Sequence, residues 1–130
     1  MARIKPAKNG TRKDVIMRKA SALFRTKGFA ASSMRDLAIS VGVEAPSLYN
    51  HIGSKSELLR EICFKIADEF TSHLEQTESK HTSSMTKLEE IIRFHIHMML
   101  EEFDEVFVAN HEWKYLKEPH LGNFHNCAAG

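Results

Sequence analysis

With 130 residues, the chain is long enough for one ordinary domain, or for one small domain and part of another. Hydrophobic residues make up 42% and charged residues 27%, a balance that excludes a disordered chain, and no apolar run approaches the ~20 residues that cross a bilayer. Residues 1–60 hold 12 Lys/Arg against 4 Asp/Glu, whereas residues 61–130 hold 6 against 13. This layout favours a nucleic-acid-binding part joined to a part with another role.

The two cysteines, Cys63 and Cys127, are too few for a disulfide framework and do not form a paired metal motif. Cys63 lies among apolar neighbours, so we expect it to pack as a small hydrophobic residue in a reducing cytosol. The N-terminal stretch is basic and polar and lacks the apolar core of a secretory signal. A cytoplasmic protein without a membrane anchor is therefore expected.

Residues 1–10 carry Lys and Arg without an apolar period and are expected to form a flexible basic arm. A first helix begins after Thr11, which has the spacing of a capping box with Asp14. Apolar residues then recur at spacings of three and four, as in a helix that buries one face. Gly28 is expected to end this helix in a left-handed conformation.

Ser33 and Asp36 repeat the capping pattern and open a short second helix, which Gly42 interrupts. Residues 44–51 predict a third short helix, in which a proline is tolerated in the first turn and which Gly53 closes. Ser54 and Glu57 have the spacing of a third capping box, the best of the three. A long amphipathic helix is expected to follow as far as residue 74.

The polar residues 75–86 are expected to form a loop, followed by a helix over 87–103 and another over 104–116. Pro119 and Gly122 indicate disruption afterwards. No stretch alternates as a half-buried strand does, so the fold class is all-α. The predicted organisation is an arm (1–10), a three-helix, helix-turn-helix domain (11–56) and a partial C-terminal helical domain for effector binding and dimerisation (57–130).

Three short helices with a glycine turn between the second and third are the helix-turn-helix unit. Ala38 is small, so the third helix crosses the second closely there, and Gly42 supplies the positive φ of the turn. Apolar residues fill the wedge between the two helices: Val41, Val43, Leu48 and Ile52. The outward residues are polar or small enough to enter a major groove: Glu44, Ala45, Ser47, Asn50 and His51.

Four blocks of this region, 22–29, 33–38, 41–52 and 54–59, resemble the signature of the TetR family of repressors in order and spacing. The resemblance covers about residues 12–60, and the stretch 44–51 is similar even to the recognition helix of the tetracycline repressor. Met34 and Ala45 depart from that protein, which has longer hydrogen-bonding side chains at both places. The resemblance implies a ligand-responsive repressor that binds a near-palindromic operator as a homodimer.

Residue roles follow from the resemblance. Ser33 and the helix amides beside it are expected to hold a phosphate, as are Tyr49, His51 and Lys55. Pro46 and Ser47 match positions at the recognition-helix tip, where thymine methyls and base edges are met. The expected DNA-binding set is completed by neighbouring positions on the second and third helices: Met34, Glu44, Ala45 and Asn50.

In this family the C-terminal helices dimerise and bind a small effector. Only part of that module is expected here, with the family's last two large helices beyond Gly130. A hydrophobic effector would suit side chains that fill irregular cavities, although plain core packing is the more common role for such side chains: Phe94, Met98, Met99, Phe103 and Trp113. Residues 110–116 resemble a stretch in regulators that sense acyl-coenzyme A thioesters, which makes an acyl-CoA one candidate.

Other functions have weaker support. His97 and Glu101 lie one helical turn apart, a possible spacing for metal ligands, but scattered surface histidines account for them and we expect no metal or cofactor. The sequence has no Gly-rich phosphate loop, nucleophile elbow or metalloprotease motif, so we expect no enzyme. A helical adaptor or a small-molecule-binding protein is the alternative to a regulator, and neither needs the basic N-terminal half.

Overall fold

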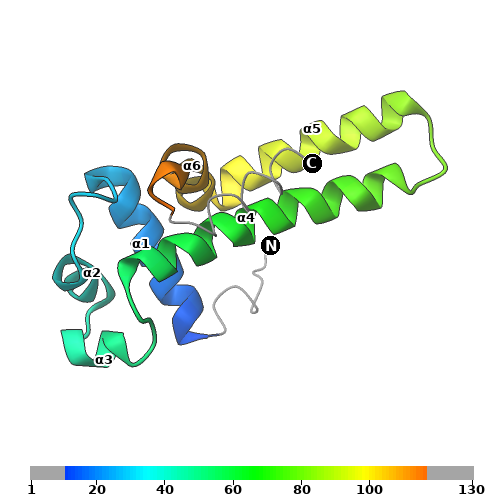
Figure 1. Ribbon diagram of the computed structural model, residues 1–130. Coiled ribbons are helices and arrows are strands. Elements are labelled where there is room, and N and C mark those ends of the chain that lie inside the picture. Colours follow the sequence, from blue (N-terminus) through cyan, green and yellow to red (C-terminus); the bar gives the residue numbers. More distant parts are fainter. Residues whose placement is uncertain (1–10, 117–130) are drawn as a thin grey trace.

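The computed structural model describes residues 11–116, and these residues form helices without any strand (Figure 1). The all-α prediction is confirmed for this part of the chain. The elements are, in order, α1 (Arg12–Lys27), α2 (Met34–Val41), α3 (Ala45–Tyr49), α4 (Lys55–Glu78), α5 (Ser84–Glu101), α6 (Phe103–His111) and the short 3-10 helix η2 (Trp113–Tyr115). The predicted N-terminal arm, Cys127 and the expected disruption at Pro119 and Gly122 lie outside the described residues.

Side-chain caps begin the helices where the sequence predicted them. Thr11 Oγ1 accepts a hydrogen bond from the Asp14 amide (3.0 Å), and Ser54 Oγ accepts one from the Glu57 amide (3.1 Å). The complete reciprocal box lies at α2 rather than at Ser54: Ser33 Oγ accepts from the Asp36 amide, and the Asp36 carboxylate accepts from the Ser33 amide. Each cap satisfies amides that a helix otherwise leaves without partners.

Several predicted boundaries were wrong. The stretch 75–86 is not all loop, because α4 continues to Glu78 with Thr77 buried, and Ser83 caps α5. The third helix ends at Tyr49, with Asn50 as its C-cap, instead of at Gly53. Gly28 has the expected positive φ of 94°, but its ψ of 145° lies outside the left-handed helical region. Polar composition alone did not separate a helix end from a loop.

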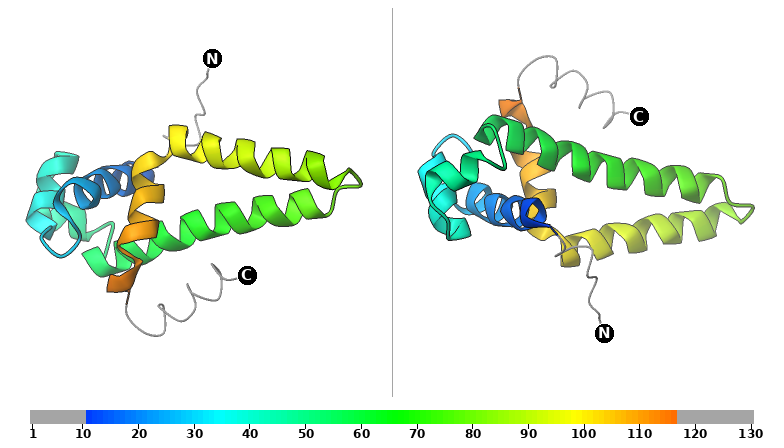
Figure 2. Two further views of the ribbon diagram at one scale, coloured as in Figure 1. Left: turned by 90° about the horizontal axis from the view of Figure 1, so that it is seen from above. Right: turned by 90° about the horizontal axis from the view of Figure 1, so that it is seen from below.

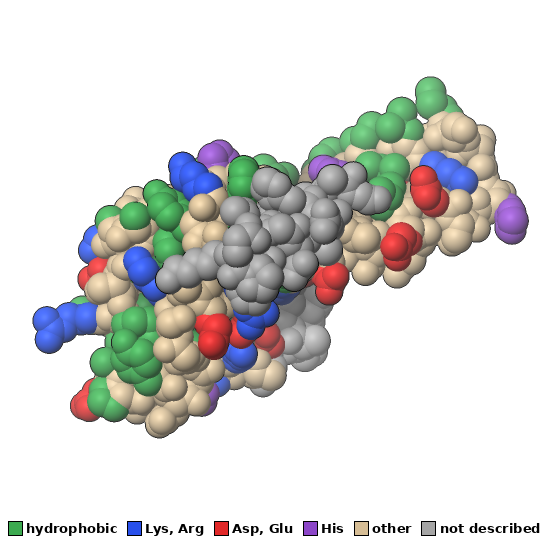
Figure 3. Space-filling model, in the orientation of Figure 1, with side chains coloured by type: hydrophobic (Ala, Val, Ile, Leu, Met, Phe, Trp, Pro, Cys, Tyr) green, Lys and Arg blue, Asp and Glu red, His purple; other side chains and the backbone are tan. Residues whose placement is uncertain are grey.

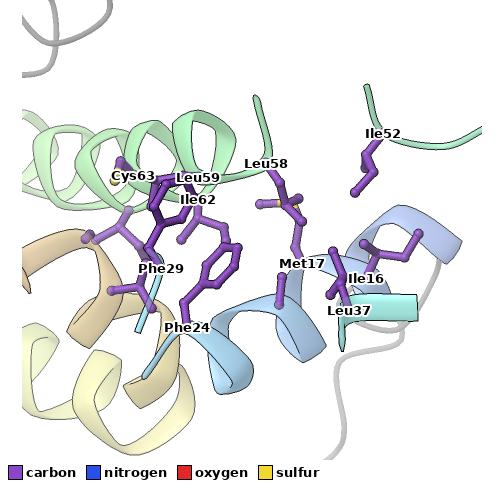
Figure 4. Close-up of a cluster of buried hydrophobic side chains, with 14 of the residues drawn as sticks. Ile16, Met17, Phe24, Phe29, Leu37, Ile52, Leu58, Leu59, Ile62 and Cys63 are labelled. Carbon is purple, nitrogen blue, oxygen red and sulfur yellow. The ribbon is translucent and has the colours of Figure 1, made fainter. Parts of the chain in front are cut away.

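The core lies between α1 and the first half of α4 (Figure 4). Phe24 of α1 meets Phe29 of the following loop edge to face, with ring centroids 5.2 Å apart, and both are buried. Cys63 is also buried, as predicted. Its burial, and to a smaller extent the nearby negative charge of Glu112, raise the pKa of its thiol to about 12. Leu37 and Leu48 bring α2 and α3 onto the same core.

Beyond this core, α4 and α5 run side by side as a long hairpin, and α6 crosses at its base (Figure 2). We call residues 67–97 the outer hairpin. Thr77 is its one buried residue. Its two helices meet through aromatic contacts, with Phe94 stacked on His73 at a centroid distance of 4.0 Å and edge to face with Phe70 at 5.3 Å. We call α1 to α3 the head. The domain boundary predicted at residue 56 falls inside α4, so the head and the outer hairpin are joined by this helix.

One face of α5 carries a row of exposed apolar side chains at spacings of three and four, visible along the edge of the molecule in Figure 3. The row continues onto the first residue of α6 and consists of Met85, Leu88, Ile92, Ile96, Met99 and Phe103. Within residues 11–116, no helix combines the length and the apolar character that crossing a bilayer requires.

Candidate nucleic-acid interface

The turn between α2 and α3 has the geometry that the sequence predicted. Gly42 adopts the left-handed conformation (φ 87°, ψ 28°), and its amide donates to the Ala38 carbonyl at 2.9 Å. The Val43 amide donates to the same carbonyl at 3.0 Å, which folds the chain back sharply beside α2. Ala38 is 3% exposed, so a longer side chain would meet the core there. A glycine is favoured at position 42 because a Cβ makes this conformation costly.

The short helix α3 buries one side and exposes the other. Leu48 and Ile52 are buried, whereas Pro46 and Ser47 are exposed at the start of the helix. The exposed side continues through Tyr49, Asn50 and His51, and Tyr49 has 53% of its surface accessible. The predicted outward face is therefore present as a surface.

Two residues of the predicted DNA-binding set in α2 and α3, Ala45 and Met34, are less exposed than the others there, whereas Glu44 is exposed as predicted. Ala45 was expected to face outward, but it is half-buried and packs against the core, as does Met34. Glu44 is exposed at the N-cap of α3, where it makes no side-chain cap. The smaller exposed surface of Ala45 leaves Pro46 to His51 as the part of α3 and its C-terminal turn that a ligand would meet.

Ser33 is exposed at the start of α2, as predicted. Its hydroxyl oxygen accepts from the Asp36 amide at 3.0 Å, which holds the side chain at the exposed start of α2, where a phosphate is expected. Asp36 is in turn paired with Lys27 at 2.7 Å. The hydrogen bond from Lys27, together with those from Ser33, lowers the pKa of Asp36. The carboxylate is thus partly neutralised at the place where an anion would approach.

Lys55 has partners other than the expected phosphate. Its ammonium group donates to the carbonyls of Phe29 (2.7 Å) and Ser32 (2.8 Å), and it lies 4.3 Å from the centroid of the Phe29 ring. These contacts tie the first residue of α4 to the loop between α1 and α2. In this structure Lys55 holds that loop, and through it the start of α2.

A second group of contacts holds the same loop from the other side, and no sequence pattern indicated it. The Phe29 amide donates to the Glu112 carboxylate at 2.6 Å, and the Tyr115 ring lies 5.4 Å from the Phe29 ring. Glu112 follows α6 and is 83 residues away along the chain. Arg25 of α1 also pairs with Asp104 of α6. The helix-turn-helix is therefore connected directly to α6, through contacts that no local sequence pattern could reveal.

A lysine of α4 completes the attachment of α6. Lys65 donates to Glu102 at 2.6 Å and to Glu105 at 2.8 Å, and both glutamates are buried. Burial lowers the pKa of Lys65, but the two hydrogen bonds outweigh this effect and leave the pKa raised. The break between α5 and α6 at Glu102 is thus fixed to the middle of α4.

The residues predicted for an effector pocket are not gathered together. Met98 is buried in the core, whereas Met99 and Phe103 are 47% and 42% exposed and belong to the apolar row on α5. Phe94 lines a shallow hollow with His73, and Trp113 lies on η2, partly buried against the core. Among residues 11–116, no three His, Cys, Asp or Glu side chains are grouped to hold a metal ion, and His97 and Glu101 are exposed.

Comparisons with known proteins agree with this geometry. A family model described as "Bacterial regulatory proteins, tetR family" matches residues 16–62, which include all of α2 and α3. Residues 16–62 thus form a TetR-family segment. The HTH-type transcriptional repressor KstR2 of Mycolicibacterium smegmatis is 26% identical over 118 residues, which cover 91% of the chain and 58% of that repressor.

Two solved structures have the same fold. The ketosteroid transcriptional regulator KstR2 of Mycobacterium tuberculosis superposes with a TM-score of 0.84 at 20% identity, over 92% of the chain and 61% of that protein. AibR was solved in complex with isovaleryl coenzyme A and operator DNA. It superposes with a TM-score of 0.78 at 22% identity, over 92% of the chain and 65% of AibR. The chain thus spans less than two thirds of the length of these relatives.

Proposed function

We propose that this chain binds operator DNA through α3. We also propose that it belongs to a ligand-responsive transcriptional repressor that acts as a homodimer. The observation that carries the proposal is the exposed surface from Pro46 to His51, held outward by the buried Leu48 and by the turn at Gly42. A surface of this size and polarity matches what a major groove admits. Phosphate contacts are assigned to Ser33, Tyr49 and His51.

The distribution of charge supports the same proposal. Residues 1–60 hold a large excess of Lys and Arg, and residues 61–130 an excess of Asp and Glu. Figure 3 shows Lys and Arg side chains projecting from the end of the molecule that carries α1 to α3. A polyanion would be attracted to that end and repelled by the other. In a dimer, two such ends would meet successive major grooves roughly one helical turn apart.

For the effector we propose a hydrophobic molecule, with an acyl-CoA as the first candidate. KstR2 is named a ketosteroid regulator and AibR was solved with isovaleryl coenzyme A, so related proteins bind ligands with large apolar or acyl groups. The contacts of Glu112 and Asp104 with the head provide a direct link, because a shift of α6 would move the loop before α2. The proposed role of the chain is binding, not catalysis.

The test separates phosphate contacts from base contacts. Affinity is measured for a panel of duplexes at several salt concentrations, for the wild type and for Tyr49→Ala, Ser47→Ala and Asn50→Ala. The wild-type association constant should fall steeply as the salt concentration rises. In a plot of the logarithm of this constant against the logarithm of the salt concentration, each contacted phosphate should add about −0.9 to the slope. Tyr49→Ala should weaken binding to all duplexes alike, whereas the other two should change the preference among them.

Two outcomes would contradict the proposal. If the wild type bound no duplex even at low salt, a helical adaptor would be the better account of the chain. If all three variants weakened every duplex equally, the division of α3 into phosphate and base contacts would be wrong. Adding a short acyl-CoA and finding unchanged affinity for the duplex would count against that effector class alone.

A further inference from the structure

A hollow lies between the first turn of α1 and the end of α3, with a volume of about 250 Å³. Its apolar lining comes from Ile16, Val41 and Val43, which belong to α1 and to the turn region around Gly42. Its polar lining consists of Arg12, Ser47, Asn50 and His51. The space is much larger than the ~30 Å³ that one water molecule occupies in the liquid.

The polar groups of the hollow are suited to an anion. Arg12 offers guanidinium donors and no acceptor, while Ser47, Asn50 and His51 each supply a hydroxyl, amide or ring donor. No aspartate or glutamate belongs to the lining. Arg12 is also the first residue of the sixteen-residue α1, whose unsatisfied amides carry a partial positive charge.

Arg12 differs from three nearby lysines in its surroundings. Lys13 pairs with Glu61 at 2.9 Å, Lys27 with Asp36, and Lys55 with backbone carbonyls. Arg12 is exposed and has no ion pair or hydrogen bond with any residue in the range 11–116. Its guanidinium is therefore placed at the hollow without a protein carboxylate to neutralise it.

We propose that Arg12, together with His51, binds a backbone phosphate of bound DNA in this hollow. The inference rests on the proposed function, because Ser47 and Asn50 belong both to the hollow and to the exposed face of α3. When a recognition helix lies in a major groove, the phosphates that border the groove run past its sides. The first helix would then add a phosphate contact that fixes how α3 enters the groove.

The test compares two charge-removing variants of the same helix, Arg12→Gln and Lys19→Gln. Lys19 is exposed on α1 but does not line the hollow, so both variants lose one charge from the head and only the first loses the proposed contact. Affinity of the full chain for one fixed duplex is measured at several salt concentrations. Thermal unfolding of both variants checks that they fold as the wild type does.

Arg12→Gln should weaken binding about tenfold at low salt, as expected for loss of one hydrogen bond between charged groups. It should also reduce the log–log salt slope by about 0.9, whereas Lys19→Gln should change both far less. Equal behaviour of the two variants, with the wild type still binding DNA, would overturn this inference and leave the proposed function standing. A wild type that binds no duplex would overturn both.

A second arm separates DNA from a free phosphate. The ring signals of His51 are followed by NMR in Lys19→Gln and Arg12→Gln, with either duplex or inorganic phosphate added. The proposal predicts that duplex shifts these signals in both variants, but that Arg12→Gln needs a duplex concentration about tenfold higher for the same shift. If inorganic phosphate produced the shift and duplex did not, the hollow would be a small-anion site and not a DNA contact.

Discussion

The head, α1 to α3, and the outer hairpin, residues 67–97, use apolar side chains in opposite ways. In the head, Leu37, Leu48 and Ile52 are buried and polar side chains face outward. On the outer hairpin, Leu88, Ile92 and Ile96 are at least half exposed. The head is therefore packed on one core that also includes the first half of α4 and α6, while the outer hairpin keeps an apolar face uncovered within residues 11–116. A surface that binds DNA is polar, so the comparison supports the proposal that the head has this role.

The largest expected effect comes from the core of the head. Leu48→Ala should lower the free energy of unfolding by roughly 2–5 kcal/mol, because Leu48 is fully buried and the substitution leaves a cavity. The matched substitution on the outer hairpin is Leu88→Ala, at a residue of α5 that is 51% exposed, which should change stability by no more than about 0.5 kcal/mol. Urea unfolding measures both. Similar losses for the two leucines would contradict the division.

A smaller effect is expected where α4 holds the loop before α2. Lys55→Met should cost about 1–3 kcal/mol, because it leaves the carbonyls of Phe29 and Ser32 without their charged donor. Lys55→Arg keeps a cation and should recover part of the loss. Chemical denaturation gives the free energies, and DNA affinity gives a second readout. If Lys55→Met kept full stability and lost only affinity, Lys55 would be a phosphate ligand after all.

The cap of α2 should contribute less. Ser33→Ala should destabilise the head by roughly 1 kcal/mol, since it removes the acceptor for the Asp36 amide. Ser33→Asp restores an acceptor and should recover the stability, but it places a negative charge where a phosphate is expected. Thermal unfolding and duplex binding are both measured. Unimpaired binding by Ser33→Asp would argue against a phosphate at this position.

The smallest effect concerns the pH dependence of the same cap. The pKa of Asp36 is lowered by its hydrogen bonds with Lys27 and Ser33, so the ionised carboxylate favours the folded state. This contribution is complete above the ordinary carboxyl pKa near 4 and is lost as the pH falls toward the lowered value. The difference in melting temperature between wild type and Asp36→Asn should therefore shrink in acid. A constant difference from pH 7 to pH 3 would contradict this.

Local patterns predicted the head well. The Ser33 cap, the Gly42 turn and the buried Leu48 each follow from residues a few positions apart, and the structure has all three. Contacts between distant segments were not predictable in this way. Lys55 was expected to face DNA because it begins a helix, but the Phe29 and Ser32 carbonyls that it meets lie over twenty residues earlier. Glu112 is farther still, and no periodicity relates it to Phe29.

On the outer hairpin, too, the sequence pattern predicted the helices but not which of their side chains are buried. An apolar period predicts that a helix buries one face, but it does not say against what. Met98 and Met99 are neighbours in the sequence, yet the first is buried and the second is 47% exposed. The predicted effector set therefore mixed core residues with an exposed face. The polar stretch 75–86 misled for a related reason, because the buried Thr77 is polar and still belongs to a helix.

The central claim, that the exposed face of α3 enters DNA while the hairpin tip stays free, is tested most directly by amide hydrogen exchange with and without a bound duplex. The account predicts slower exchange at residues 33–36 and 45–51 when DNA is added, and unchanged exchange at the tip, residues 79–84. Protection at the tip together with unchanged exchange over 45–51 would contradict it.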